Sequence, residues 1–230
     1  RNQAASAARG AYVAFLDSDD KWYPQKVARQ VEFMESRPDI PLCHTLCDVI
    51  DEYSIVRRVR QPLEIMPGTG MIFERLLEHC WITISTVMVR RNLFDEIGWF
   101  NTEAPYGYLG EDHEFFLRVS RKYPIGMIPE VLAAFRKAGQ GITARNWTAI
   151  PKPVPLFEAL LQRRDIWGGI VPRSAMVRAI TDKCDENAYY YRVRKEFDRA
   201  RWFAWRCLRA DPLDLRGWKH LASSVLRRNA

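Results

Sequence analysis

No apolar run in the sequence is long enough to cross a lipid bilayer, which excludes an ordinary membrane-spanning helix among these residues. The sequence also lacks the regular, even-numbered cysteine spacing of a disulfide framework. Its five cysteines are scattered along the chain: Cys43, Cys47, Cys80, Cys184 and Cys207. Such cysteines are typical of reduced thiols, so we expect a cytoplasmic protein.

Zinc and nucleic-acid motifs are also missing. Cys43, His44 and Cys47 could be read as zinc ligands, but they lie in an alternating, strand-like run and no matching second pair follows. No motif that combines basic and aromatic residues indicates nucleic-acid recognition. We therefore expect neither a zinc site nor a nucleic-acid partner.

The sequence is rich in core-forming residues, and its charge is unevenly distributed. The 230 residues are 47% hydrophobic and 12% aromatic, enough for one large domain or a domain with an appendage. Residues 192–230 contain eleven Lys or Arg and four Asp or Glu, which accounts for the whole net charge of +7, while residues 1–191 contain twenty-four of each. A basic tail of this kind either contacts an anionic membrane or an acidic partner, or is only a soluble helical surface.

Apolar periodicity in the first fifty residues predicts alternating helices and strands. An Ala-rich helix over residues 3–9 should end at Gly10, and the continuous apolar run 11–16 should be a buried parallel strand. Pro24 should open a helix whose inner face is Val27, Val31 and Met34, and residues 42–50 should form another strand. This rhythm is typical of an α/β architecture.

The middle of the chain continues this pattern. We expect a helix over 71–78, a strand over 82–91, a short helix that ends at Gly98 and, after a loop over 101–110, a helix that begins at Glu111. One or two short strands should follow over 125–137.

The pattern changes after the proline-rich stretch "IPKPVP", beyond which the chain reads as helix throughout. We therefore predict two domains, residues 1–148 and 149–230. Small and aromatic residues at helical spacing make residues 190–230 similar to a tetratricopeptide-type helix pair, with Asp211–Pro212 at the break. We expect the tryptophans of this pair to be packing residues.

Three carboxylates follow the apolar run in "AYVAFLDSDDKWYP": Asp17, Asp19 and Asp20. Like charges this close resist ionising together unless a positive group lies between them. The cluster could be a solvated turn, or Asp20 could cap the helix that follows Pro24. A third interpretation is a divalent cation held by carboxylate oxygens.

Three blocks that occur in order resemble family 2 glycosyltransferases with the GT-A fold. They are "AARGAYVAFLDSDDKWYPQKVARQV", "ISTVMVRRNLFDEIGWFN" and "GEDHEFFLRV", and the resemblance covers roughly residues 1–145. It implies a mixed α/β sheet, here without the family's first βαβ unit, followed by a helical C-terminal extension. On this comparison we expect the chain to be an N-terminally truncated fragment with little activity of its own.

The resemblance also implies a chemistry for the carboxylates. A nucleotide-sugar donor would bind with Mn²⁺ or Mg²⁺, which stabilises the departing diphosphate. Asp19 would be the principal metal contact, with Asp17 beside it near the ribose or sugar. In an extended segment the D-x-D spacing would put these two on one side. Asp20 would assist directly or only cap the next helix.

The same comparison assigns the catalytic base of an inverting transfer to Asp112, with Glu111 orienting the base or the acceptor. Without the resemblance, Asp112 would be read as a first-turn acid that favours the helix dipole. Trp81 and Tyr108, with Tyr106, could stack on a sugar of the acceptor, although Trp81 could equally be a core-packing residue. Arg136 could contact the diphosphate.

The acceptor expected from the family is a glycan, glycolipid or protein, in the context of bacterial cell-surface polysaccharide. The basic C-terminal helices could bring the protein to the inner face of an anionic membrane. Two other functions remain open: a metal-dependent nucleotidyltransferase or phosphohydrolase, and a helical interaction module that carries a non-catalytic transferase remnant.

Overall fold

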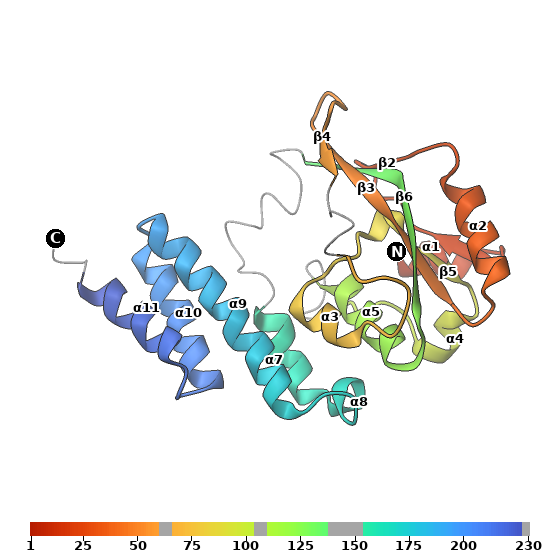
Figure 1. Ribbon diagram of the computed structural model, residues 1–230. Coiled ribbons are helices and arrows are strands. Elements are labelled where there is room, and N and C mark those ends of the chain that lie inside the picture. The colour runs from red at the N-terminus through yellow and green to blue at the C-terminus, as the bar shows by residue number, and fades with distance from the viewer. Residues whose placement is uncertain (60–65, 104–109, 138–153, 227–230) are drawn as a thin grey trace. The chain divides into compact units, whose positions relative to one another are not determined.

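The computed structural model describes residues 1–59, 66–103, 110–137 and 154–226, which form two compact units (Figure 1). The N-terminal unit spans Arg1–Arg145 and the C-terminal unit spans Asn146–Ala230. The domain boundary predicted at residues 148–149 lies outside the described residues.

The helices and strands of the N-terminal unit alternate along most of its length. In chain order they are α1 (Asn2–Ala7), β1 (Tyr12–Ala14), β2 (Lys21–Trp22), α2 (Lys26–Ser36), β3 (Leu42–Ile50), β4 (Val56–Val59), α3 (Phe73–Glu78), the 3₁₀ turn η2 (Ile84–Thr86), β5 (Met88–Arg90), α4 (Leu93–Ile97), α5 (Glu111–Lys122) and β6 (Ile125–Arg136).

The strands form one mixed sheet in the order β1-β5-β3-β6-β2, with β4 paired to β3. The long strands β3 and β6 run parallel along its centre, and the other pairings are antiparallel. The prediction for β3 is confirmed residue for residue. The prediction of a parallel strand after Gly10 is wrong, because β1 pairs antiparallel with β5 through Tyr12–Arg90 and Ala14–Met88.

One predicted helix end is confirmed, and three other element bounds differ from the prediction. α4 ends at Gly98, whose φ of 82° is the left-handed conformation that glycine adopts without strain. α1 ends at Ala7 rather than at Gly10. The strand expected over 82–91 divides into η2 and β5, and the last predicted strands form one long strand, β6.

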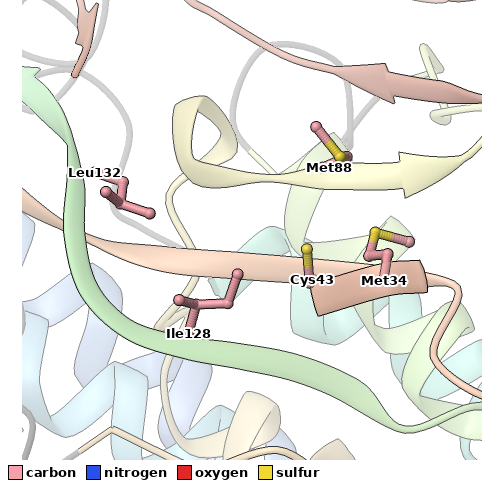
Figure 2. Packing of buried hydrophobic residues seen from close by; sticks show 5 residues of the cluster. All are labelled: Met34, Cys43, Met88, Ile128 and Leu132. Atoms are coloured by element: carbon pink, nitrogen blue, oxygen red, sulfur yellow. The ribbon is translucent and has the colours of Figure 1, made fainter. Parts of the chain in front are cut away.

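One face of the sheet packs against α2, while α3 and α5 lie on the other face (Figure 1). Figure 2 shows the core on the α2 side, where Met34, Cys43, Met88, Ile128 and Leu132 are buried together. The face of α2 toward this core is partly the predicted one. Met34 is buried in the core and Val31 packs against it, but Val27 is 44% exposed, and the polar residues Lys26 and Gln30 are buried as well.

The C-terminal unit is helical, as its sequence predicts. Its helices are α7 (Val154–Gln162), α8 (Arg164–Trp167), α9 (Arg173–Val193), α10 (Phe197–Ala210) and α11 (Leu215–Leu226). α10 and α11 form the helix pair expected from the "ADP" break. The expected packing role of its tryptophans is only partly correct, because Trp202, Trp205 and Trp218 are 42%, 59% and 50% exposed.

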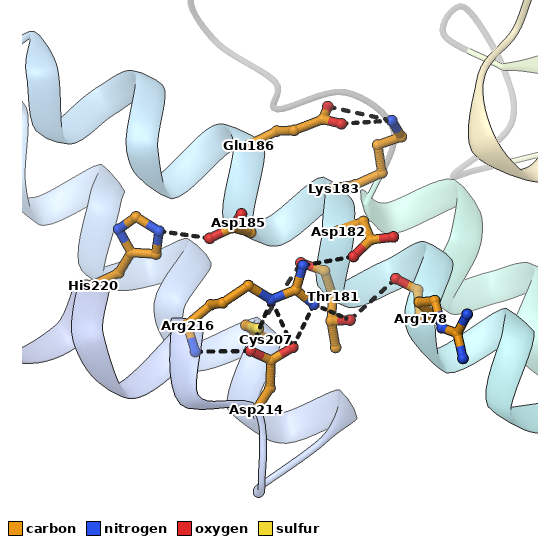
Figure 3. A network of polar contacts seen from close by, with 10 residues as sticks. All are labelled: Arg178, Thr181, Asp182, Lys183, Asp185, Glu186, Cys207, Asp214, Arg216 and His220. Atoms are coloured by element: carbon orange, nitrogen blue, oxygen red, sulfur yellow. Dashed lines mark hydrogen bonds and ion pairs between the residues drawn. The ribbon is translucent and has the colours of Figure 1, made fainter.

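A polar network joins α11 to α9 in this unit (Figure 3). Arg216 donates to Asp182 at 2.7 Å, to Thr181 at 3.1 Å and to the Asp214 carboxylate. His220 bonds to Asp185 at 2.8 Å. These contacts fix the last helix of the pair. Among the described residues, no helix is long and apolar enough to span a membrane.

Candidate active site

A cluster of aromatic rings brings the end of β1 to the start of α5. Phe15 packs edge-on against Phe100 at a ring-centroid distance of 5.3 Å, and Phe100 packs against Phe115 at 4.6 Å. Asn2 pairs its side-chain amide with the backbone of Phe100. Because Phe15 lies two residues before Asp17 and Phe115 three residues after Asp112, this cluster holds the two predicted carboxylate segments close together.

Arg1 bridges the two carboxylate segments directly. One guanidinium nitrogen lies 3.0 and 3.1 Å from the carboxylate oxygens of Asp17, and another pairs with Glu111. Burial opposes the charge of Arg1, but Asp17 and Glu111 outweigh it and keep the pKa of Arg1 above its usual value. The strand-end acid and the helix-start acid are thus parts of one polar cluster.

The segment Asp17–Asp20 is a turn rather than an extended run. The backbone N–H of Asp20 bonds to the carbonyl oxygen of Asp17 at 3.0 Å, so the expectation that Asp17 and Asp19 share one side of an extended segment is wrong. Asp17 points to Arg1. Asp19 is exposed, and its carboxylate makes no hydrogen bond or ion pair with another described residue.

Asp20 is buried and holds the turn in place. Its carboxylate accepts from the Ser85 hydroxyl at 2.5 Å and from the backbone N–H of Arg136 at 2.8 Å. The Ser85 oxygen also accepts from the N–H of Asp17 at 3.1 Å. Burial raises the pKa of Asp20, against the opposing effect of these bonds. α2 has no side-chain cap, so Asp20 does not cap that helix.

Arg136 fastens the carboxylate turn to the tip of the β3–β4 hairpin. Its Nε donates to the Asp19 carbonyl at 2.8 Å, and its terminal nitrogens donate to the Asp51 carbonyl at 2.5 Å, the Glu52 carbonyl at 3.1 Å and the Ser54 hydroxyl at 3.0 Å. The expected contact between Arg136 and a diphosphate would have to compete with these bonds.

We expect Arg136→Met to release the hairpin tip, because at least four donated hydrogen bonds would be lost. Amide hydrogen exchange over residues 51–55 should accelerate about tenfold to a hundredfold, the effect of losing a few bonds to a charged donor. Arg37→Met, which removes an exposed ion pair with Asp39, is the matched control. Unchanged exchange at residues 51–55 would contradict the role of Arg136 as the tether.

The two acids at the start of α5 lie in different surroundings. Glu111 pairs with Arg1, while the half-buried carboxylate of Asp112 accepts from the backbone N–H of His113 at 2.7 Å. Burial raises the pKa of Asp112, and the nearby charge of Arg1 opposes this rise. A carboxylate whose pKa is raised in this way is suited to accept a proton.

Trp81 is part of a small apolar cluster instead of standing free. It is half-buried against the cluster of Leu46, Met66 and Met127, and its Nε1 donates to the Arg75 carbonyl at 3.2 Å. The predicted acceptor residue Tyr108, and Tyr106 with it, lie outside the described residues.

The carboxylates of the turn offer few ligands to a metal ion. Within the described ranges, no group of three or more His, Cys, Asp or Glu side chains is arranged to hold one, and Cys43, His44 and Cys47 form no such group. Asp17 is engaged by Arg1 and Asp20 by Ser85, which leaves Asp19 open. Mg²⁺ commonly binds through one or two carboxylates together with phosphate oxygens, so a cation brought with a diphosphate fits this turn.

Two residues of the site were not singled out from the sequence, Arg1 and Ser85. Both lie in or beside the blocks that carry the resemblance. However, a lone serine in "ITISTV" and an arginine before an Ala-rich helix have no local pattern that assigns them partners. Arg1 pairs with Glu111, 110 residues away in the sequence, and Ser85 bonds to Asp20, 65 residues away.

Sequence similarity relates this chain to known glycosyltransferases. Residues 1–98 match the family model "Glycosyl transferase family 2". TuaG of Bacillus subtilis, whose name assigns it to teichuronic acid biosynthesis as a glycosyltransferase, is 30% identical over 66% of this chain and 57% of its own. The Escherichia coli glucosyltransferase WfaP, named for UDP-Glc and α-D-GlcNAc-diphosphoundecaprenol, is 32% identical over 53% of this chain and 43% of its own.

The fold has a counterpart among solved structures. The crystal structure of Staphylococcus aureus TarS 1–349 in complex with UDP-GlcNAc superposes with a TM-score of 0.56 at 14% identity, over 97% of this chain and 67% of that one. The chain spans about half the length of the two curated relatives named above. The family match and the shared fold lead to one conclusion: the N-terminal unit has the GT-A fold, and residues 1–98 within it match glycosyl transferase family 2.

Proposed function

We propose that the protein transfers a sugar from a nucleotide-diphosphate donor to an acceptor hydroxyl, with inversion and with the help of a divalent cation. The observation that carries this proposal is the meeting of the Asp17–Asp20 turn with Glu111 and Asp112 across Arg1. The turn offers the open carboxylate of Asp19, and the half-buried carboxylate of Asp112, near Arg1 and Asp17, can take up a proton. Single displacement at a sugar requires a base for the acceptor hydroxyl and stabilisation of the leaving group, and these two carboxylates could supply them.

The roles of the residues follow from their surroundings. The acceptor oxygen attacks the anomeric carbon while the bond from that carbon to the diphosphate oxygen breaks, and the acceptor proton passes to Asp112. Asp19 would hold Mn²⁺ or Mg²⁺, which neutralises charge on the departing diphosphate. Asp17, fixed by Arg1, lies beside the donor, and Glu111 orients Asp112 and the acceptor.

Relatives support a uridine nucleotide donor and a surface glycan or glycolipid acceptor. TarS was solved with UDP-GlcNAc, and WfaP is named for UDP-Glc and a diphosphoundecaprenol-linked sugar. Such an acceptor lies at a membrane surface. We propose that the C-terminal helices, which are basic and carry exposed tryptophans, make a peripheral contact with the anionic cytoplasmic leaflet. The five cysteines, all within the described ranges, form no disulfide with one another, which suits a reducing compartment.

Calorimetric titration of uridine diphosphate, with and without MnCl₂, is the experiment that tests this function. We expect binding that requires the metal. Metal-dependent binding of nucleoside triphosphates in preference to uridine diphosphate would favour a nucleotidyltransferase instead. Absence of binding by either class would contradict the proposal.

A further inference from the structure

Lys26 is a lysine with no exposed surface, although it opens α2 beside the carboxylate turn. A buried ammonium loses its hydration and needs partners in return. Its Nζ lies 2.5 Å from the Gln30 side-chain oxygen and 4.3 Å from the centre of the Trp22 ring. Within the described part of the chain, no carboxylate pairs with it. Lys26 is therefore held by an amide and by the negative face of an aromatic ring.

Both partners of Lys26 bind consecutive carbonyl groups of η2. The Trp22 indole N–H donates to the Ser85 carbonyl at 2.7 Å, and the Gln30 amide donates to the Thr86 carbonyl at 2.9 Å. The hydroxyl of the same Ser85 accepts from the Asp17 N–H and donates to Asp20. A continuous path of direct contacts therefore leads from the buried ammonium to the carboxylate turn.

We propose that Lys26 is a positioning residue, which clamps Trp22 and Gln30 onto η2 and so fixes the Asp17–Asp20 turn in the geometry that receives the donor diphosphate. This inference rests on the proposed function. Lys26 would not touch the donor. Its charge would act through Trp22 and Gln30, because a neutral side chain of similar length would give up the attraction to the ring and leave the Gln30 oxygen without its donor.

The titratable groups around Lys26 make this role measurable. Burial lowers the pKa of Lys26 from 10.5 to about 8. Cys43, which faces it from β3, has a pKa raised by burial to about 12 and stays neutral in this range. Arg90 of β5 also faces this group, because its charge acts on Cys43. Raising the pH through 8 therefore removes the charge of Lys26 within this group.

Affinity and stability should then change in opposite directions. Between a folded-state pKa of about 8 and an unfolded-state pKa of 10.5, the unfolded chain binds more protons, so the contribution of Lys26 to stability rises with pH. Donor affinity should fall over the same range, because the clamp weakens. A residue that only supports the fold would not show these opposite trends.

The experiment compares Lys26→Met with Lys183→Met by calorimetric titration of uridine diphosphate in the presence of Mg²⁺. Lys183 is also buried, at 6% exposure, but lies in the C-terminal unit paired with Glu186, so it controls for the loss of a buried lysine. We expect Lys26→Met to weaken binding about tenfold, as befits one cation–π contact and one hydrogen bond. Lys183→Met should bind like the unmodified protein.

The pH series supplies the second readout. The unmodified protein should lose affinity between about pH 7 and pH 9, while Lys26→Met should show no such loss. Trp22→Phe keeps the ring over Lys26 but removes the bond to Ser85, so it should also weaken binding. If Lys26→Met does not fold, this variant tests the clamp in its place. If the unmodified protein and both variants bind uridine diphosphate equally tightly, this inference is overturned and the proposed function is not. Unmodified protein that binds no uridine diphosphate would overturn the proposed function and this inference with it.

Discussion

Asp112→Asn should reduce sugar transfer by about 10²–10⁴-fold, the usual contribution of a positioned general base. Asparagine has nearly the same shape but cannot accept the proton of the acceptor hydroxyl. Binding of uridine diphosphate should change little, because the donor is held at the Asp17–Asp20 turn. The measurement is transfer from a UDP-sugar to acceptor, alongside calorimetry with uridine diphosphate.

Asp95→Asn is the matched control for this variant. Asp95 is an exposed acid in the first turn of α4, so its replacement removes the same helix-dipole interaction without touching the site. If Asp112 served only the dipole of α5, the two variants would lose similar, small amounts of activity. Full transfer by Asp112→Asn would exclude it as the base.

The pH dependence of Asp112 has a definite sign. Burial raises its folded-state pKa above the unfolded value, although Arg1 opposes the rise. The stability that Asp112 contributes is therefore present below the unfolded pKa and is lost as the pH rises through the folded pKa. At neutral pH its charge costs stability, so Asp112→Asn should raise the melting temperature there but not in acid. As the pH falls, the rate of sugar transfer should decline at a higher pH than it would if the base were an exposed aspartate.

Asp19→Asn should abolish the metal dependence of uridine diphosphate binding. Asp19 is the carboxylate of the turn that no described residue engages, so its loss removes the charged protein ligand proposed for the cation. We expect the dissociation constant with Mn²⁺ to rise at least about tenfold, which corresponds to about 1.4 kcal/mol. Treatment of the unmodified protein with EDTA should give the same weak binding.

Asp39→Asn provides the control for the change in charge. Asp39 is exposed in the same unit and pairs only with Arg37 among the described residues. This variant should retain metal-dependent binding in full. Undiminished metal dependence in Asp19→Asn would show that the cation, if one binds, has other ligands.

The helix that follows the carboxylate turn shows where pattern reading fails. Val27, Val31 and Met34 were expected on its inner face because they are apolar. Met34 and Val31 do contact the core, but the structure also buries Lys26 and Gln30. Apolar periodicity assigns polar side chains to the exposed face of a helix. Here they are buried because the neighbouring Trp22 ring covers Lys26, and the Thr86 carbonyl of η2, distant in sequence, accepts from Gln30.

The direction of β1 has a similar explanation. A continuous apolar run is typical of a parallel strand covered on both faces, and the run after Gly10 fits that pattern. In the fold, Phe15 belongs to the aromatic cluster beyond the strand, and β1 pairs antiparallel with β5. Apolar content reports burial, but it does not report which neighbour a strand will pair with.

The sequence by itself determined the order of most elements, the helical C-terminal unit and the carboxylates Asp17, Asp19, Asp20 and Asp112, because periodicity, glycine punctuation and motif blocks are local properties of the chain. Only the tertiary structure decided how these carboxylates differ. It engages Asp17 with Arg1, locks Asp20 to Ser85 and directs Arg136 into the chain's own carbonyls, while Asp19 stays open. Such differences arise from partners far away in sequence, and those partners meet only when the sheet and its aromatic core assemble.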